Sequence, residues 1–231
     1  MKKLKKKNLF ILCIILLIII SFGTFVVVHF RNNGQTEEIH TVPDEKKEEN
    51  EMIIDENGLT FVRGILLVNK HHSLPRNFSP GEDPQALAQV NLLITEMRSL
   101  GFDICTTFSG FRSFERQEEL YNGFVLRHGR EEADRFSARP GHSEHQSGLA
   151  FDLRHRSGQL VTNEREANWI SENAHRFGFI VRYPENSEHI TGFIHEPWHI
   201  RYIGDKAEKI WKSGLTLEEF LGMDPAPTYL D

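Results

Sequence analysis

The sequence predicts an α+β fold, in which helices pack on a small antiparallel sheet behind a single N-terminal transmembrane helix. Three observations support this prediction. Helix signals occur in three segments, at residues 83–101, 113–128 and 163–177. Short runs with β-branched and aromatic residues are typical of strands, and they lie at 148–154, 178–183 and 190–203. Near the start, an uncharged run is long enough to cross a bilayer.

The N-terminus has the pattern of a membrane anchor. Residues 1–7 contain five lysines, and Leu9–Val28 carry no formal charge. As a helix, this run rises about 30 Å, which is the thickness of the hydrocarbon core. We therefore assign residues 1–7 to a basic cytoplasmic tail and 8–28 to a transmembrane anchor. Because a lysine-rich flank stays in the cytoplasm, the rest of the chain is expected on the outer side of the cell membrane, as a single-pass protein.

A cleaved signal peptide is the alternative interpretation of this segment. Such peptides have an apolar region of about 7–15 residues followed by a small-residue cleavage site. Here the apolar run is longer, and "SFGTF" at 21–25 is a poor cleavage site. The anchor is therefore the favoured interpretation, with the lipid bilayer as its partner.

Residues 29–51 are polar and charged, and they contain too few apolar side chains to offset the entropy of folding. We interpret them as a flexible stalk and residues 52–231 as one folded domain. The formal net charge of −6 makes nucleic acid a poor candidate partner. Cys13 lies in the apolar run and Cys105 is alone in the domain, so no disulfide within the domain is expected. The domain is expected to be a monomer.

Capping residues define the elements of the domain. Asp83 as N-cap, Pro84 at the first helical position and Gly101 past the end delimit the first helix. The other predicted elements are a strand at 102–108, a helical turn at 130–134, and short helices at 205–213 and 216–222.

The stretch 143–152, "SEHQSGLAFD", places a carboxylate inside a predicted strand. Alternation puts Ala150 and Asp152 on one face, opposite the apolar side chains of Leu149 and Phe151. A carboxylate there is costly unless it is paired or bound to a cation. On residue type alone, Asp152 pairs either with a nearby arginine or with a metal ion.

His195–His199, "HEPWH", matches the H-E-x-x-H pattern of helical zinc proteases. Pro197 argues against that interpretation, because it lacks a backbone N–H and disfavours helix at Glu196. On an extended chain, residues four apart lie about 13 Å from each other, too far for both histidines to bind one ion. The helical zinc-protease hypothesis predicts that His195 is a metal ligand, and we do not favour it.

Three ordered motifs resemble the zinc D-alanyl-D-alanine carboxypeptidases of the vancomycin-resistance (VanY) type, over roughly residues 64–221. The stretch 143–152 fits their S-x-H-x-x-G-x-A-x-D signature, and 196–199, "EPWH", fits E-x-W-H. "SGFRS" at 109–113, followed by Gln117, is similar to a third motif, which often has Tyr where this chain has Phe111.

The resemblance implies one zinc ion per chain, held by His145, Asp152 and His199. Three protein ligands leave the fourth position open, as catalytic zinc requires. By the same resemblance, Glu196 is the general base and then the proton donor to the leaving amine.

Further site residues also follow from the resemblance. Arg112 is expected to steady the oxyanion or a nearby carboxylate, and Gln117 to contact the substrate. Ser143 and Tyr183 are further candidate substrate-binding residues. On a regular strand Glu196 and His199 would point to opposite faces. Both can therefore serve one site only if the chain turns between them, and Pro197 gives a reason for such a turn.

These inferences predict a zinc carboxypeptidase that removes the C-terminal D-alanine from peptidoglycan stem peptides, a D-Ala-D-Ala carboxypeptidase. The alternatives are an L,D-carboxypeptidase acting on the tetrapeptide stem, which the same motifs allow, and a catalytically silent peptidoglycan-binding module. A silent module predicts no tightly bound zinc, and Glu196 with the three ligand positions argues against it.

Overall fold

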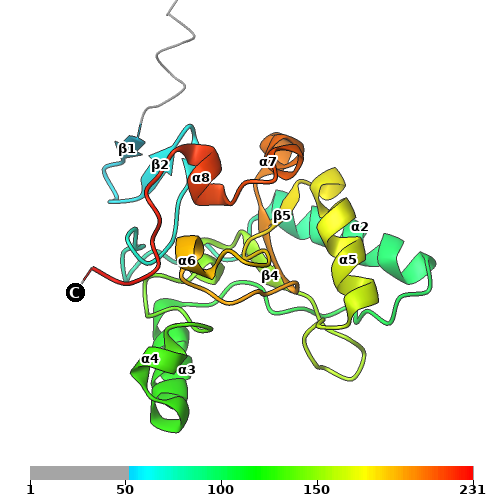
Figure 1. The fold of residues 1–231 in the computed structure, drawn as a ribbon, viewed down its shortest axis with the longest axis horizontal. Coiled ribbons are helices and arrows are strands. Elements are labelled where there is room, and N and C mark those ends of the chain that lie inside the picture. The colour runs from blue at the N-terminus through cyan, green and yellow to red at the C-terminus, as the bar shows by residue number, and fades with distance from the viewer. Residues whose placement is uncertain (1–51, 231) are drawn as a thin grey trace, which may run out of the picture. The chain divides into compact units, whose positions relative to one another are not determined.

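Figure 1 presents the computed structural model of the chain, which describes residues 52–230. Two antiparallel sheets are present in this range. The first has the order β1 (Met52–Ile54), β2 (Thr60–Val62), β3 (Ile65–Leu66). The second has the order β4 (Ala150–Asp152), β6 (His199–Tyr202), β5 (Phe179–Val181). The predicted α+β class with small antiparallel sheets is confirmed.

The helices flank these sheets. The longer ones are α2 (Pro84–Ser99), α3 (Phe114–His128) and α5 (Glu164–Asn173). The shorter ones are α4 (Arg130–Ala133), α6 (Glu188–Thr191), α7 (Ala207–Ser213) and α8 (Leu217–Leu221). Four-residue 3₁₀ turns lie at η2 (Glu144–Ser147) and η3 (Ala174–Phe177), and a shorter one at η4 (Gly204–Lys206). In Figure 1, α3 and α4 lie together, away from α7 and α8.

Side chains cap the starts of α2 and α3, and the predicted N-cap Asp83 is one of them. The Asp83 side chain accepts hydrogen bonds from the backbone N–H groups of Gln85 and Ala86 at 2.9 and 2.8 Å, and Pro84 occupies the first turn of α2. The Ser113 hydroxyl caps α3 by accepting from the backbone N–H of Arg116. These contacts satisfy donors that the first turn of a helix leaves without partners.

The sheet β4-β6-β5 separates an apolar core from a polar face. Phe151, Ile200 and Phe179 are fully buried and pack with α2 and α5 in the main core. Because side chains alternate along a strand, Asp152 and His199 point to the other face. They are cross-strand partners in the register of β4 and β6. The strand pairing therefore brings two of the predicted ligands side by side.

The predicted strand 190–203 is wrong over its first nine residues, because only His199–Tyr202 form a strand. Residues Glu188–Thr191 form α6, and Gly192, with a φ of +79°, ends it. Ile190 and Phe193 suggested a strand by composition. Phe193 is instead buried as part of a loop, outside any strand. The next residue, Ile194, donates its backbone N–H to the backbone carbonyl of Arg135.

The predicted strand 102–108 forms only isolated bridges. Ile104 pairs with His155, and Ser109, just past the segment, pairs with Asp152. The segment runs beside β4 but touches it at separated points, so no regular ladder forms. The predicted helix 163–177 continues to Phe177, with its last turn in the 3₁₀ conformation.

Within residues 52–230, no helix is both long and apolar enough to cross a bilayer. The predicted tail 1–7, anchor 8–28 and stalk 29–51 lie outside the described residues. These three assignments stay predictions.

Gly148 closes the η2 turn at a point of close backbone approach. Its φ is +74°, and a Cβ there would lie 2.0 Å from the carbonyl oxygen of Gly81. Gly158, with φ +86°, has no atom within 4 Å of the same position. We expect Gly158→Ala to lower the free energy of unfolding by about 1 kcal/mol, the cost of the left-handed conformation. Gly148→Ala should cost about 1–3 kcal/mol more, because the backbone must move.

Urea denaturation of both glycine variants measures this difference. Equal losses of unfolding free energy in the two variants would mean that the close approach of residues 81 and 148 adds nothing to the cost of the left-handed backbone conformation.

Candidate active site

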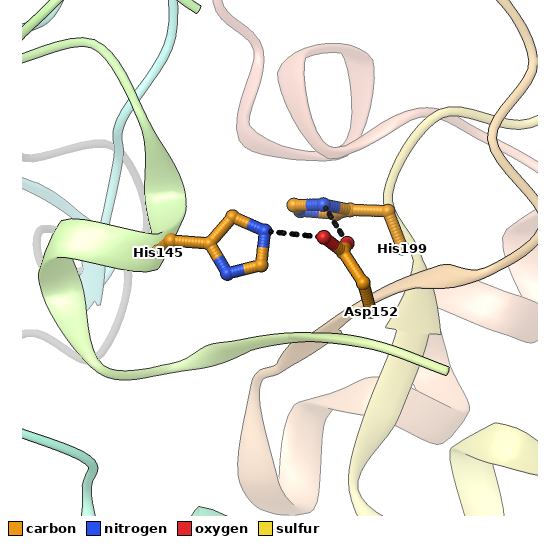
Figure 2. Close-up of side chains that lie close together, drawn as sticks. All are labelled: His145, Asp152 and His199. Carbon is orange, nitrogen blue, oxygen red and sulfur yellow. Dashed lines mark hydrogen bonds and ion pairs between the residues drawn. The ribbon is translucent and has the colours of Figure 1, made fainter. Parts of the chain in front are cut away.

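Three side chains that could hold a metal ion meet on the polar face of the second sheet. His145 lies in η2, Asp152 in β4 and His199 in β6, and all three are buried. One ligand atom from each lies within 4.8 Å of the others. Figure 2 shows a dashed line from each imidazole ring to the carboxylate of Asp152, with His145 to its left and His199 above it. The structure thus brings together the three ligands that the resemblance implied.

The hydrogen-bond partners of each imidazole indicate which nitrogen faces the site. Nδ1 of His145 lies 2.8 Å from the carbonyl oxygen of Gly110, and a carbonyl only accepts, so Nδ1 carries the proton. By the same reasoning, Nε2 of His199 donates to a carboxylate oxygen of Glu144 at 3.2 Å. Nε2 of His145 and Nδ1 of His199 then face Asp152, each at 3.1 Å.

This arrangement fits a zinc ion. Burial lowers the pKa of His145 from its ordinary value, so the imidazole is neutral near pH 7. Its Nε2 lone pair then faces an Asp152 oxygen with no proton between them, and a cation satisfies both atoms. Tetrahedral zinc with ligand distances of about 2.0–2.1 Å separates its ligand atoms by about 3.3 Å. The two 3.1 Å separations, one to each carboxylate oxygen of Asp152, are close to that value.

The carboxylate of Asp152 is ionised. Burial alone would raise its pKa, but the protonated ring of His199, which donates to it, holds that pKa well below the ordinary value. Burial alone would likewise lower the pKa of His199, but hydrogen bonds to Asp152 and Glu144 raise it to about 9. Without metal, His199 therefore carries protons on both nitrogens at pH 7.

Zinc binding should consequently release at least one proton at pH 7, because the metal displaces the proton on Nδ1 of His199. Zinc affinity should rise as the pH rises to about 9, since the proton competes with the metal below the pKa of His199. Calorimetric titration of the metal-free chain in buffers of different ionisation enthalpy counts the protons. Zinc binding without proton release would contradict this protonation state.

Glu196 lies beside the three candidate ligands without joining them. One of its carboxylate oxygens is 4.0 Å from Nδ1 of His199. The backbone carbonyl of Glu196 accepts a hydrogen bond from the backbone N–H of His199 at 3.1 Å, and this bond closes a turn across Pro197. The chain therefore turns where the two side chains need to share a face. Burial raises the pKa of Glu196 to about 8.

His195 points elsewhere. It is exposed, and its Nδ1 lies 3.0 Å from the carbonyl oxygen of Tyr183. Residues 195–198 form a loop and a turn, not a helix. The helical zinc-protease hypothesis is therefore wrong in its geometry, and His195 is outside the ligand group.

Arg112 approaches the candidate ligands from the loop before α3. Its Nη2 lies 3.6 Å from Asp152, and the same atom donates to the Ser109 hydroxyl at 3.2 Å. Its Nη1 donates to the Gln117 side chain at 2.8 Å. Burial lowers the pKa of Arg112. Gln117 also donates to the carbonyl of Ala138 at 2.6 Å, so its amide is engaged in holding Arg112.

A cavity of about 470 Å³ contains every predicted site residue. Ser143 and Tyr183 line it and are almost fully buried, and the Tyr183 ring lies 5.0 Å from the His199 ring. Phe124, Phe136 and Trp198 add apolar walls. A larger cavity of about 1080 Å³, lined in part by α4 and the C-terminal segment, contains none of the three candidate ligands. The chemistry therefore belongs to the smaller cavity.

Glu144, Arg182 and Arg201 were not predicted. Glu144 occupies an unspecified position of the first motif, between Ser143 and His145. Arg201 was detectable in principle, because it lies two residues after His199 and so shares its face of the strand. Nothing in the sequence pairs these residues with one another.

The sequence comparisons agree with this geometry. Residues 81–205 match the VanY family, described as D-alanyl-D-alanine carboxypeptidase. A D-alanyl-D-alanine carboxypeptidase of Enterococcus faecalis is 41% identical over 126 residues, which cover 50% of this chain and 47% of that protein. The chain thus spans about half the length of this curated relative.

Solved structures are similar over a larger share. The LdcB LD-carboxypeptidase matches with a TM-score of 0.75 and 43% identity, over 78% of this chain and 98% of that chain. The vancomycin-resistance D,D-pentapeptidase VanY of a VanB-type cassette was solved in complex with Zn(II). It matches with a TM-score of 0.60 and 35% identity, over 68% of this chain and 97% of that chain.

Proposed function

Because this chain belongs to the VanY family of D-alanyl-D-alanine carboxypeptidases, we propose that it is a zinc-dependent carboxypeptidase that removes the C-terminal D-alanine from peptidoglycan stem peptides. One observation carries the proposal. His145, Asp152 and His199 converge in a cavity that also contains Glu196 and Arg112. The Zn(II) complex of a VanY relative supports zinc as the metal.

A zinc ion at this site supplies Lewis acidity, which polarises a peptide carbonyl and makes water a better nucleophile. The chain's own residues do the rest. Glu196 takes a proton from the attacking water and passes it to the leaving amine. Burial raises the pKa of Glu196, and a zinc cation in the site would lower it again by favouring the carboxylate, the form that accepts the proton.

Arg112 provides a positive charge beside Asp152. Gln117 and Ser109 fix its guanidinium at 2.8 and 3.2 Å. In that position it can stabilise the developing oxyanion or bind the terminal carboxylate of the substrate. Ser143 and Tyr183, in the same cavity, complete the proposed substrate contacts.

D,D-specificity is proposed first, since it is the activity by which the family is described. L,D-specificity is the second candidate. The LdcB LD-carboxypeptidase matches this chain with a higher TM-score than the D,D-pentapeptidase does. Its match also covers a larger share of this chain.

The zinc-loaded full chain, incubated with stem pentapeptide and with stem tetrapeptide, separates the two candidates by mass spectrometry of the products. Loss of one alanine from the pentapeptide indicates D,D-activity, and loss from the tetrapeptide indicates L,D-activity. Turnover of neither peptide would contradict the proposed enzyme. Binding without turnover would favour the silent binding module.

The proposed location follows from the N-terminal sequence. The tail 1–7 and the anchor 8–28 support a single-pass membrane protein, with a stalk at 29–51 and the carboxypeptidase domain at 52–231 facing the cell wall. Protease added to intact cells should remove the domain and leave the anchor in the membrane fraction. A protected domain would contradict this topology. The domain is proposed to act as a monomer.

A further inference from the structure

A cluster of four buried charges lies against the outer nitrogen of His199. It consists of Glu144, Arg182, Arg201 and Glu218, hereafter the buried charge cluster, and each member is at most 1% exposed. Two carboxylates and two guanidiniums give the cluster no net charge. Burying four charges is costly even when they are paired, and a hydrophobic replacement is often as stable. Stability alone therefore does not account for the cluster.

Glu144 is the member that contacts the candidate metal site. Its Oε1 accepts from Arg182 Nε at 2.8 Å and from Arg201 Nη1 at 2.7 Å. Its Oε2 is left for His199, with 3.2 Å between that oxygen and Nε2. Each guanidinium is a permanent cation, so the carboxylate that accepts from both of them is ionised. These two hydrogen bonds also fix its orientation.

The rest of the cluster holds these guanidiniums in place. Arg182 makes two parallel hydrogen bonds with Glu218 of α8, at 2.9 and 2.5 Å. Asn69 donates to the same carboxylate at 3.1 Å, and Arg201 donates to the carbonyl of Leu66 at 2.6 Å. Glu218 thus shares Arg182 with Glu144, but it has no contact with His199.

A charged Glu144 determines which nitrogen of His199 is available to a metal. An ionised carboxylate only accepts hydrogen bonds, so Nε2 must carry a proton. In the neutral imidazole, the lone pair is then on Nδ1, the atom 3.1 Å from Asp152. The partner of the outer nitrogen of a metal-binding histidine also fixes its ring and raises its basicity.

We propose that Glu144 is a positioning residue for zinc: it holds His199 with Nε2 protonated and Nδ1 directed to the metal, and the rest of the buried charge cluster holds Glu144. This inference rests on the zinc site of the proposed function, but not on which peptide the enzyme cleaves. It assigns a role to a residue that the motifs leave unspecified.

The test compares Glu144→Gln with the matched control Glu218→Gln in the full chain. Both changes neutralise one buried carboxylate bonded to Arg182, and only the first replaces the anionic group that accepts from His199 with an amide, which can also present a donor to it. Chelator competition measures the zinc dissociation constant, and circular dichroism confirms that each variant is folded. We expect Glu144→Gln to weaken zinc binding by about 10- to 100-fold, the usual loss for such partners, and Glu218→Gln to weaken it much less. Equal weakening, or no weakening by Glu144→Gln, would overturn the proposal.

A second measurement needs no variant and decides the matter if Glu144→Gln does not fold. Long-range ¹H–¹⁵N NMR of the zinc-loaded wild-type chain reports which nitrogen of His199 is protonated. The proposal requires a protonated Nε2 and a metal-bound Nδ1, and the reverse assignment overturns it. Neither measurement uses a substrate, so failure of the proposed peptidase activity would appear separately, in the peptide assay.

Discussion

The Glu196→Gln variant is expected to bind zinc as tightly as the wild type and to lose turnover by about 10²- to 10⁴-fold, the usual contribution of a general acid–base group. The substitution preserves the size of the side chain but removes its ability to take a proton. Zinc should remain, because Glu196 lies 4.0 Å from His199 Nδ1 and is outside the group of three candidate ligands. Its backbone turn with His199 does not involve the side chain.

Three measurements check this result: zinc content of the purified chain, kcat on the preferred stem peptide, and melting temperature. Glu185→Gln is a suitable control, because Glu185 is exposed and lies 4.0 Å from His195 rather than in the cavity. Its turnover should match that of the wild type. Turnover by Glu196→Gln at the wild-type rate would remove Glu196 from the mechanism and with it the proposed reaction.

The Asp152→Ala variant is expected to lose zinc and, with it, all measurable turnover. Asp152 is one of the three candidate ligands and approaches both imidazoles at 3.1 Å. Loss of a hydrogen-bond partner of a ligand weakens metal binding by about 10- to 100-fold. Loss of the ligand itself should weaken zinc binding by more than that. The variant also leaves Arg112 without its nearest carboxylate. Circular dichroism is therefore needed to confirm that the chain is folded.

His195→Ala is the matched comparison, since His195 belongs to the H-E-x-x-H match but not to the ligand group. Its zinc content and turnover should equal those of the wild type. The helical zinc-protease hypothesis predicts the opposite ranking of the two alanine variants. Zinc lost from His195→Ala and kept by Asp152→Ala would therefore reject the site described above.

Local signals predicted the helices well and the strands only in part. The strands predicted at 148–154 and 178–183 contain β4 and β5, whereas those at 102–108 and 190–203 were largely wrong. Asp83 and Ser113 act through hydrogen bonds to residues two or three positions away, so their effect can be recognised in the sequence. The strand predicted at 190–203 was too long because apolar composition has the same appearance in two cases. It cannot distinguish a strand paired in a sheet from a loop in which individual apolar side chains are buried. At 188–191 a short helix forms instead, and tertiary contacts decide that outcome.

The residues of the candidate site were likewise predicted only in part. The motifs supplied the candidate ligands His145, Asp152 and His199, and Pro197 indicated the turn before the last of them. Glu144 was missed because its importance depends on partners up to 57 positions away, at Arg201. Such pairings are created by the fold. The sequence signal for Glu144 is its position as a carboxylate directly before the motif histidine His145.

The order of strands in the second sheet has a consequence for the synthesis of this protein. β6 is the last strand in the sequence and lies between β4 and β5, which do not pair with each other. Until residues 199–202 have been made, the two earlier strands lack their common partner, and the nascent chain lacks one candidate metal ligand. Contacts between distant residues form late because loop closure costs entropy. A nascent chain that stops short of β6 therefore holds neither the sheet nor a complete group of candidate ligands, and the ability to bind zinc arises only after residue 199 has been made.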